Sequence, residues 1–442
     1  MSEKAHWTEK PAFGGAQFAA CIYPAFVAYH LTWYCTDVAL IPPLVTGVLL
    51  FGMRLFGALY DNAVGVFINR TQFRDGKYRP YYKWCAVPYA VSLALLCTMP
   101  VTSLAARVVY LAVMLIFCAI FNSVIGTATF AMIPYVAKSD VDRTKFVSFC
   151  IVCSILTYIL IGTFLPPLVE FLGNGDKRVG FPSAMTLLAI LAVPLLFAAY
   201  FLLKERHFTV AASTATIREL VTTVTQNRRL LFFFAGYGIY ATANGFKNQT
   251  TYFYLTYNME RLDLLPVVIF AGLASPLAMQ VVIPRLLALA RKETLLVVGL
   301  FGAAGGSLLM AAAGRTPAAL IACVVVYGMF TAVFANLVYA VMASFTDEIM
   351  ESKSIRMSDV LAATMRFSDR VGIAVTGGMV PLVLWLSGYV APSLEQLAAG
   401  QVAEQSATAL AGIKALYIFL TAVGLILAGL AMLQLRKSET TA

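Results

Sequence analysis

The sequence predicts an all-α transmembrane protein with twelve spanning helices arranged as two six-helix bundles. Of its 442 residues, 60% are hydrophobic and 12% are charged, and the mean hydropathy is +0.80. A soluble domain is about 45–50% apolar and about 25% charged, so this composition cannot supply a water-facing surface. Apolar runs recur along almost the whole chain, and about 20 such residues cross the hydrocarbon layer. They are far longer than the strands of about ten residues in an outer-membrane barrel, so the spans are predicted to be helices.

Charged breaks divide the apolar runs into two sets of six. The expected spans are Phe13–Tyr34, Leu44–Ile68, Trp84–Pro100, Val108–Val136, Phe146–Leu172 and Pro182–Leu203, followed by Leu230–Tyr257, Leu264–Pro284, Thr294–Ala313, Pro317–Phe345, Val360–Leu386 and Ala411–Leu435. We therefore expect an N-terminal bundle over residues 1–203, a cytoplasmic linker over 204–229 and a C-terminal bundle over 230–442. Two such halves joined by an inner linker are typical of the major facilitator superfamily.

The basic residues predict the orientation of the chain. Most of the 32 Lys and Arg residues fall in inner loops when both termini are placed in the cytoplasm, as expected for a multi-pass protein of a bacterial inner membrane. Residues 1–11 lack the apolar core of a cleaved signal peptide. Topology and contact with membrane lipids explain the net charge of +10, so nucleic-acid binding is not expected.

The most specific segment runs from the second span into the following loop. It carries Arg54, Asp61, Gly65, Asn69, Arg70, Thr71, Arg74, Gly76, Lys77, Arg79 and Pro80. This pattern resembles the signature of the glycoside-pentoside-hexuronide cation symporters, the sugar-transporting branch of the major facilitators. The resemblance continues at Tyr34–Val38, Ile133–Pro134, Asp142–Arg143, Asp347, Arg356 and Arg370. It implies a secondary transporter with alternating access, in which Arg70, Arg74, Gly76, Lys77, Arg79, Asp347 and Arg356 act in gating.

The chain departs from that family where the family binds its sugar and its cation. Gln17 stands at the position of an Asp in the first span, and Gly57 replaces the first of two Asp residues in the second span. The sugar-binding Asp of the fourth span and Arg of the fifth correspond to Gly126 and Ile151. The galactoside recognition groups of the family are therefore largely absent.

Asp61 is the candidate for cation coupling, together with Arg54 on the same helix. A sodium site needs several hard oxygen ligands, usually including more than one carboxylate, so Asp61 alone makes a poor one. A single buried carboxylate can still bind and release a proton. We expect proton coupling through Asp61 or no coupling; the alternative is a purely structural pairing of Asp61 with Arg54 or with a cation of the eleventh span.

The charge inside the spans indicates the solute. Lys247 lies in the polar stretch Asn244–Thr251, and four cations, Arg54, Lys247, Arg366 and Arg370, outnumber Asp61 and Asp369. A positive cavity favours an anionic solute such as a uronide, a sulfonated sugar or a carboxylate. The candidate solute-binding residues are Gln17, Tyr60, Lys247, Asn248, Gln249, Tyr252 and Arg370. Uncoupled exchange of a neutral sugar or glycoside, transport of a lysolipid-like amphiphile, and a transporter-like receptor remain open.

Other functional classes lack their signatures. The sequence contains no H-E-x-x-H motif, no catalytic Ser/His/Asp set and no phosphate-binding loop, so we expect neither an enzyme nor an ATP-driven pump. No metal and no cofactor are expected, apart from co-transported H⁺ or Na⁺. The expected partners are the small-molecule solute and membrane lipids, and the chain is expected to be a monomer.

Overall fold

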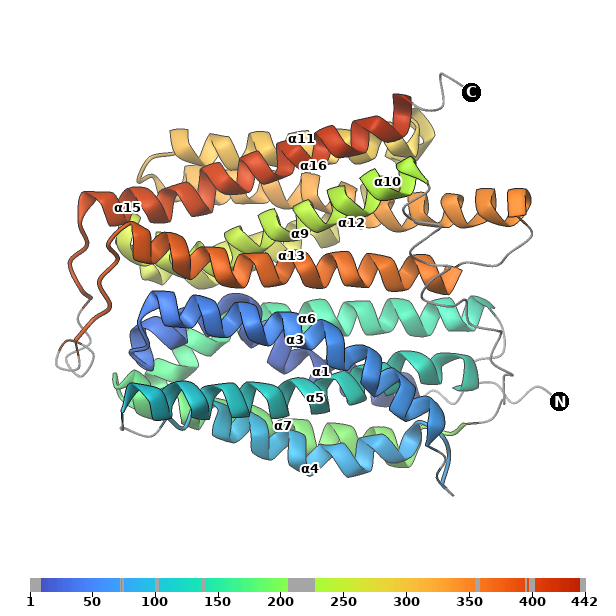
Figure 1. Ribbon diagram of the computed structural model, residues 1–442, viewed down its shortest axis with the longest axis horizontal. Coiled ribbons are helices and arrows are strands. Elements are labelled where there is room, and N and C mark those ends of the chain that lie inside the picture. Colours follow the sequence, from blue (N-terminus) through green and yellow to red (C-terminus); the bar gives the residue numbers. More distant parts are fainter. Residues whose placement is uncertain are drawn as a thin grey trace. The chain divides into compact units, whose positions relative to one another are not determined.

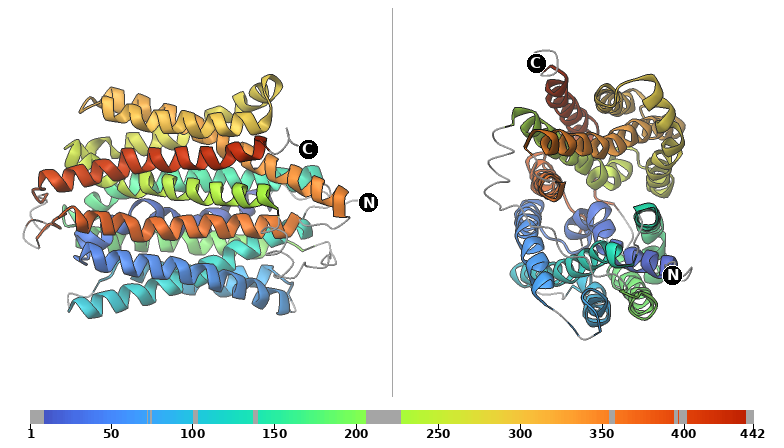
Figure 2. Two further views of the ribbon diagram at one scale, coloured as in Figure 1. Left: turned by 45° about the horizontal axis from the view of Figure 1, so that its top comes forward. Right: turned by 90° about the vertical axis from the view of Figure 1, so that its right-hand side faces the viewer.

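The computed structural model is built almost entirely of helices (Figure 1). It describes residues 9–71, 73, 75–99, 103–136, 140–205, 227–353, 358–393, 396 and 402–437. The chain separates into two compact units, one comprising Met1–Val210 with Val390–Glu404 and the other Ala211–Tyr389 with Gln405–Ala442. The expected linker, residues 204–229, lies mostly outside the described residues. Within each unit, long helices run alongside one another (Figure 2).

Within its described residues, the first unit contains six long helices and two short helical segments. They are α1 (Glu9–Tyr29), α2 (Leu31–Trp33), the π-helix η1 (Tyr34–Val38), α3 (Pro43–Arg70), α4 (Arg79–Leu96), α5 (Leu104–Val136), α6 (Asp140–Gly173) and α7 (Lys177–Leu202). Helix α1 packs against α6 and α7, and α4 packs against α5 and α7. The end of α7 and the start of α4 therefore belong to one packed body.

In the part of the second unit that the structure describes, the six-helix plan recurs with two π-helical interruptions. Its elements are α9 (Arg228–Phe253), η2 (Tyr254–Asn258), the 3₁₀ turn η3 (Leu262–Leu264), α10 (Leu265–Leu289), α11 (Lys292–Ala312), α12 (Pro317–Lys353), α13 (Ser358–Leu386), α15 (Ala407–Lys414), η4 (Ala415–Leu420) and α16 (Thr421–Lys437). Helix α9 packs against both α13 and α16, and α11 packs against α12 and α16. The last expected span corresponds to α15, η4 and α16 taken together.

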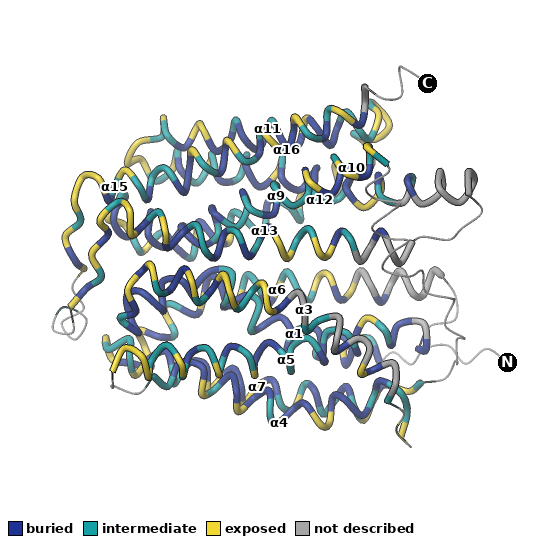
Figure 3. Tube along the Cα trace, viewed as in Figure 1, coloured by how far each residue is buried: buried dark blue, intermediate teal, exposed yellow. Residues whose placement is uncertain are grey.

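Each of the twelve expected spans overlaps one of these helices, or a helix with its short helical extensions, and the all-α prediction is confirmed. Within the described residues, nine helices are long and apolar enough to cross a membrane. Helix α9 does not meet this standard because its second half is rich in Asn, Gln, Thr and Lys. Many large apolar side chains are exposed, including Phe171, Phe201 and Leu289, and the burial pattern changes along each helix (Figure 3). Such a surface is suited to lipid contact.

Glycines allow close approach of neighbouring helices in both units. A Cβ atom on Gly180 of α7 would lie 2.0 Å from the carbonyl oxygen of Val169 on α6. In the second unit, a Cβ atom on Gly372 of α13 would lie 2.4 Å from the carbonyl oxygen of Gly238 on α9. Small residues let helices associate in a membrane by close packing where the hydrophobic effect gives little driving force. This packing fixes how α9 is rotated, and so which of its polar residues face inward.

Candidate functional site

The loop between α3 and α4 encloses a carboxylate of the same unit. The backbone N–H groups of Lys77, Tyr78 and Arg79 donate hydrogen bonds of 2.7, 2.7 and 2.8 Å to the carboxylate of Glu205, just beyond the end of α7. The first N–H groups of a helix have no intrahelical acceptor and carry partial positive charge, so a carboxylate there is stabilising. Glu205 therefore satisfies the start of α4 and attaches it to α7.

Gly76 makes this arrangement sterically feasible. Its φ angle is +127°, which residues with a side chain rarely adopt, and a Cβ atom there would lie 2.9 Å from Glu205 Oε1. Arg79 adds a second attachment: its Nε donates to the carbonyl oxygen of Tyr200, and its guanidinium carbon lies 4.8 Å from the centre of the Tyr200 ring. The Gly-Lys-x-Arg-Pro part of the motif thus builds a defined turn around a carboxylate.

Tyr78 is the buried aromatic side chain of this turn. Its ring packs edge-on against Tyr135 of α5, with ring centres 5.2 Å apart. Burial of the side chain is the main cause that raises the pKa of Tyr78 to about 12, and the neighbouring Tyr135 is the second. The phenol is therefore neutral at physiological pH and places no negative charge beside Glu205.

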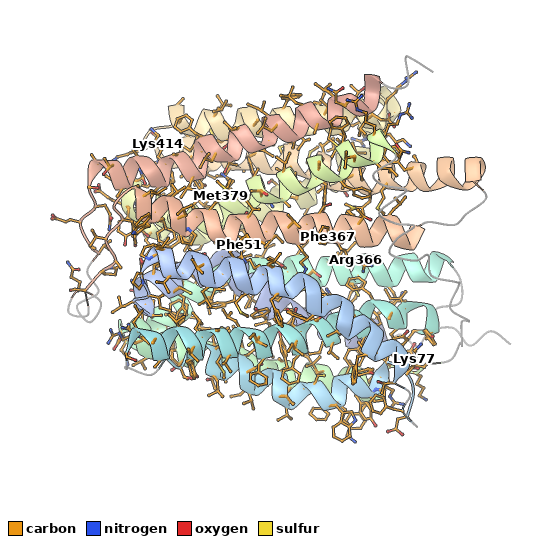
Figure 4. All side chains as sticks on the ribbon, in the orientation of Figure 1. Phe51, Lys77, Arg366, Phe367, Met379 and Lys414 are labelled. Carbon is orange, nitrogen blue, oxygen red and sulfur yellow. The ribbon has the colours of Figure 1, made fainter. Side chains whose placement is uncertain are left out.

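The remaining gating candidates are only partly described. Arg74 and Arg356 lie outside the described residues, as do the side chains of Arg70 and Asp347. The ammonium of Lys77 lies 5.4 Å from the ring centre of Tyr78, at the end of the first unit (Figure 4). Gating by these residues therefore stays a proposal.

The polar residues of α1 form hydrogen bonds within the first unit. Gln17 is buried and donates from Nε2 to the hydroxyl of Ser154 on α6 at 2.9 Å, while its Oε1 has no hydrogen-bond partner. Asn122 of α5, which the sequence analysis did not select, donates to the carbonyl oxygen of Ala20 at 2.5 Å. A side chain at Gly126 would meet no atom within 4 Å, and Ile151 is half exposed. The positions that correspond to the family's sugar-binding pair are therefore open but apolar.

Helix α3 brings Arg54, Tyr60 and Asp61 onto one element, each with intermediate exposure. The ring of Tyr60 lies 3.7 Å from where a Cβ atom on Gly57 would stand. The Tyr60 phenol therefore occupies the side of the helix vacated by the missing carboxylate. It offers a hydroxyl where the family pattern places a charge.

Lys247 of α9 is enclosed by aromatic rings inside the second unit. Its side chain is 5% exposed, and its ammonium lies 4.0 Å from the ring centre of Tyr417 on η4 and 4.6 Å from that of Tyr327 on α12. The same nitrogen lies 3.0 Å from the sulfur of Met310 on α11. A cation over an aromatic face gains about 0.5–2 kcal/mol. The polar sequence around Lys247 predicted that this residue faces a solute cavity, but in this structure its contacts are with the packed interior.

The neighbours of Lys247 divide between buried and half-buried positions. Gln249 and Tyr252 are each 3% exposed, whereas Asn248 has intermediate exposure. Thr251 donates to the carbonyl oxygen of Lys247 at 2.7 Å. The polar stretch of α9 therefore serves helix packing on one side and leaves Asn248 more accessible on another.

Helix α13 exposes two guanidinium groups within its predicted span. Arg366 and Arg370 are both exposed and lie four residues apart, on one face of the helix (Figure 4 labels Arg366). Asp369 has intermediate exposure, and its carboxylate interacts with Arg370 and with the hydroxyl of Tyr237 on α9. A charged side chain facing hydrocarbon costs about 2.5–3.5 kcal/mol on insertion scales, so this face of α13 is expected to meet water.

Comparison with known proteins agrees with this architecture. Residues 12–436 match the family model described as MFS/sugar transport protein. The chain is 25% identical over 433 residues to the isoprimeverose transporter of Lactiplantibacillus pentosus, covering 97% of this chain and 88% of that protein. It is 20% identical over 399 residues to the glucuronide carrier protein homolog of Escherichia coli K12, covering 89% and 87%.

Solved structures show the same fold at low sequence identity. The nucleoside transporter NupG aligns with a TM-score of 0.66 and 11% identity, over 98% of this chain and 100% of that one. The D-xylose-proton symporter aligns with a TM-score of 0.66 and 16% identity, over 96% of each chain. The chain therefore belongs to the MFS/sugar transport protein family, as a divergent member of its glycoside-pentoside-hexuronide cation symporter branch and a multi-pass membrane transporter.

Proposed function

We propose that the chain transports a glycoside that carries an acidic group, such as a uronide, by alternating access. Two compact helical units are what alternating access requires, because one repeat moves against the other during the cycle. Relatives whose names refer to glycosides and glucuronides support the solute class. The observation that supports an acidic solute is the exposed guanidinium of Arg370.

An arginine is suited to this role because its planar fork matches the two oxygens of a carboxylate. We assign the carboxylate of the glycoside to Arg370 and its hydroxyls to half-buried polar groups of the same unit, such as Asn248. In the first unit, Tyr60 and Gln17 stay candidates for contact with the solute, and Gln17 has a carbonyl oxygen without a hydrogen-bond partner. Gln249 and Tyr252 are buried, and Lys247 is held between rings, so we assign these three no direct contact in this conformation.

A matched pair of solutes tests the proposal. Radiolabelled p-nitrophenyl glucuronide and p-nitrophenyl glucoside differ only at C6, which is a carboxylate in the first and a hydroxymethyl group in the second. Both can be offered to purified protein in liposomes. We expect the glucuronide to enter at least tenfold faster, because a charge-assisted hydrogen bond contributes about 1.5–3 kcal/mol. Equal rates would contradict the acidic solute, and binding of either glycoside without flux would indicate a receptor.

A neutral glycoside is the second candidate. The isoprimeverose transporter aligns with nearly the whole chain, and the charge of Lys247 is already met by Tyr327, Tyr417 and Met310. Faster entry of the glucoside than of the glucuronide in the same vesicles would favour this reading.

We propose that transport is coupled to protons through Asp61, which has intermediate exposure on α3. Replacing it by Asn removes the titrating group and preserves its size. In Asp61→Asn we expect exchange of labelled for unlabelled glucuronide to continue, while accumulation driven by an inward proton gradient falls to the equilibrium level. Accumulation that persists in the variant would exclude Asp61, and a response to a Na⁺ gradient in place of a proton gradient would identify the other coupling ion.

A further inference from the structure

The enclosure of Lys247 is built by four helical segments of the second unit. The lysine comes from α9, Met310 from α11, Tyr327 from α12 and Tyr417 from η4. Two rings and a thioether touch the ammonium, and in the described part of the chain no carboxylate lies within 4 Å of it. The titratable groups that face Lys247 are Tyr327 and Cys323 from α12 and Tyr417 from η4.

These contacts stabilise a cation without supplying a compensating negative charge. Ring faces and sulfur interact with an ammonium only weakly in comparison with the water that it loses on burial. A buried amine without an anionic partner can avoid this penalty by releasing its proton. Lysine also loses and gains a proton more readily than arginine, which stays charged in proteins. The position is therefore suited to a group that changes its charge.

The walls of the enclosure lie on segments that can rearrange. Tyr417 belongs to the π-helix η4, and its ring stacks on Tyr254 of the π-helix η2 with ring centres 4.4 Å apart and an angle of 13°. The hydroxyl of Tyr327 donates to Asn244 of α9, one turn before Lys247, at 3.2 Å. Short π-helical turns within helices frequently mark functional sites. A shift of η4 or α12 relative to α9 would part the rings and admit water to the amine.

We propose that Lys247 is a second proton-binding site of the transport cycle, neutral while the rings of Tyr327 and Tyr417 enclose it and protonated when they part and admit water. The step transfers one proton from the ammonium to a water molecule and leaves a neutral amine; protonation from the other side reverses it. The inference rests on the proposed function, since it requires coupled transport, and it makes coupling depend on two groups, Lys247 in the second unit and Asp61 in the first.

The test compares two fixed charge states with the wild type. Lys247→Arg keeps the charge permanently and Lys247→Met removes it at similar side-chain length. In liposomes we expect both variants to exchange p-nitrophenyl glucuronide within about threefold of the wild-type rate. Under an inward proton gradient, we expect the wild type to accumulate the glycoside at least tenfold and both variants to reach only equilibrium. Tyr417→Phe keeps the ring and is expected to accumulate like the wild type.

Several results would overturn the proton site. If Lys247→Met exchanges and also accumulates the glycoside, Asp61 alone carries the proton. If the wild type equilibrates the solute without accumulating it, the proposed proton site is excluded, whereas the proposed transport of the glycoside is not.

If the wild type moves neither glycoside, the proposed function fails, and the melting temperature of the purified protein between pH 6 and pH 9 still tests proton binding at Lys247. We expect the pH dependence of melting to differ between wild type and Lys247→Met; identical profiles would exclude proton binding there.

Discussion

Glu205→Ala is expected to lower the melting temperature of the purified transporter by about 5–10 °C. The substitution leaves three backbone N–H groups at the start of α4 without their acceptor, and it removes a carboxylate from the positive end of that helix. Loss of charge-assisted hydrogen bonds at a half-buried site costs about 2–3 kcal/mol, which corresponds to a shift of this size for a unit of about 200 residues. Thermal unfolding in detergent, followed by tryptophan fluorescence, measures it.

Two controls separate the carboxylate from its surroundings. Glu205→Gln retains one acceptor oxygen, so it is expected to lower the melting temperature by about half as much. Gly76→Ala keeps Glu205 but places a Cβ atom 2.9 Å from its oxygen at a φ of +127°, so it is expected to be as damaging as Glu205→Ala. If Glu205→Ala melts like the wild type while Gly76→Ala does not, the loop is held by its backbone conformation and the carboxylate contributes little.

The helices and their order could be predicted from the sequence, because span length and charged breaks are local properties. Most expected spans, for example Thr294–Ala313 against α11 (Lys292–Ala312), differ from their helices by only a few residues at each end. The π-helices η1, η2 and η4 were not expected. They depend on a single inserted residue in the hydrogen-bonding pattern, which hydropathy does not register.

The basic loop between α3 and α4 is a site of which only one side could be predicted from the sequence. Its residue pattern identified Gly76, Lys77 and Arg79 as important. Their partner Glu205 lies 126 residues beyond Arg79 and belongs to no motif that the sequence revealed. A possible signal was the positive end of α4, which begins with Arg79 and Pro80 and has no acidic residue in its first turn. The unpaired N–H groups of such a helix start predict a carboxylate at the end of a packed neighbour, which here is Glu205 after α7.

Lys247 shows why the direction of a side chain could not be predicted. Its neighbours Asn244, Asn248 and Gln249 made the whole stretch look like a cavity lining, since polar residues in a span usually serve function. The rotation of α9 is set by close packing, such as that of Gly238 against α13 and Gly236 against α16. That rotation places Lys247 against Tyr327 and Tyr417 and leaves Arg370 of α13 as the more exposed cation.

Arg370→Gln is expected to abolish the preference for an acidic glycoside. The amide keeps a hydrogen-bond donor but loses the charge and the second donor pair, so discrimination should fall by at least tenfold, equivalent to about 1.4 kcal/mol. Arg366→Gln is the matched control, because it removes the same charge from the same face of α13, one turn nearer the start of the helix. It is expected to change the preference by less than threefold.

The ratio of p-nitrophenyl glucuronide to p-nitrophenyl glucoside entry, measured for wild type and Arg370→Gln in identical liposomes, tests the central claim most directly. The account predicts a ratio of at least ten for the wild type and about one for the variant, with glucoside entry unchanged between them. A wild-type ratio near one, or a ratio that survives the loss of Arg370, would contradict it.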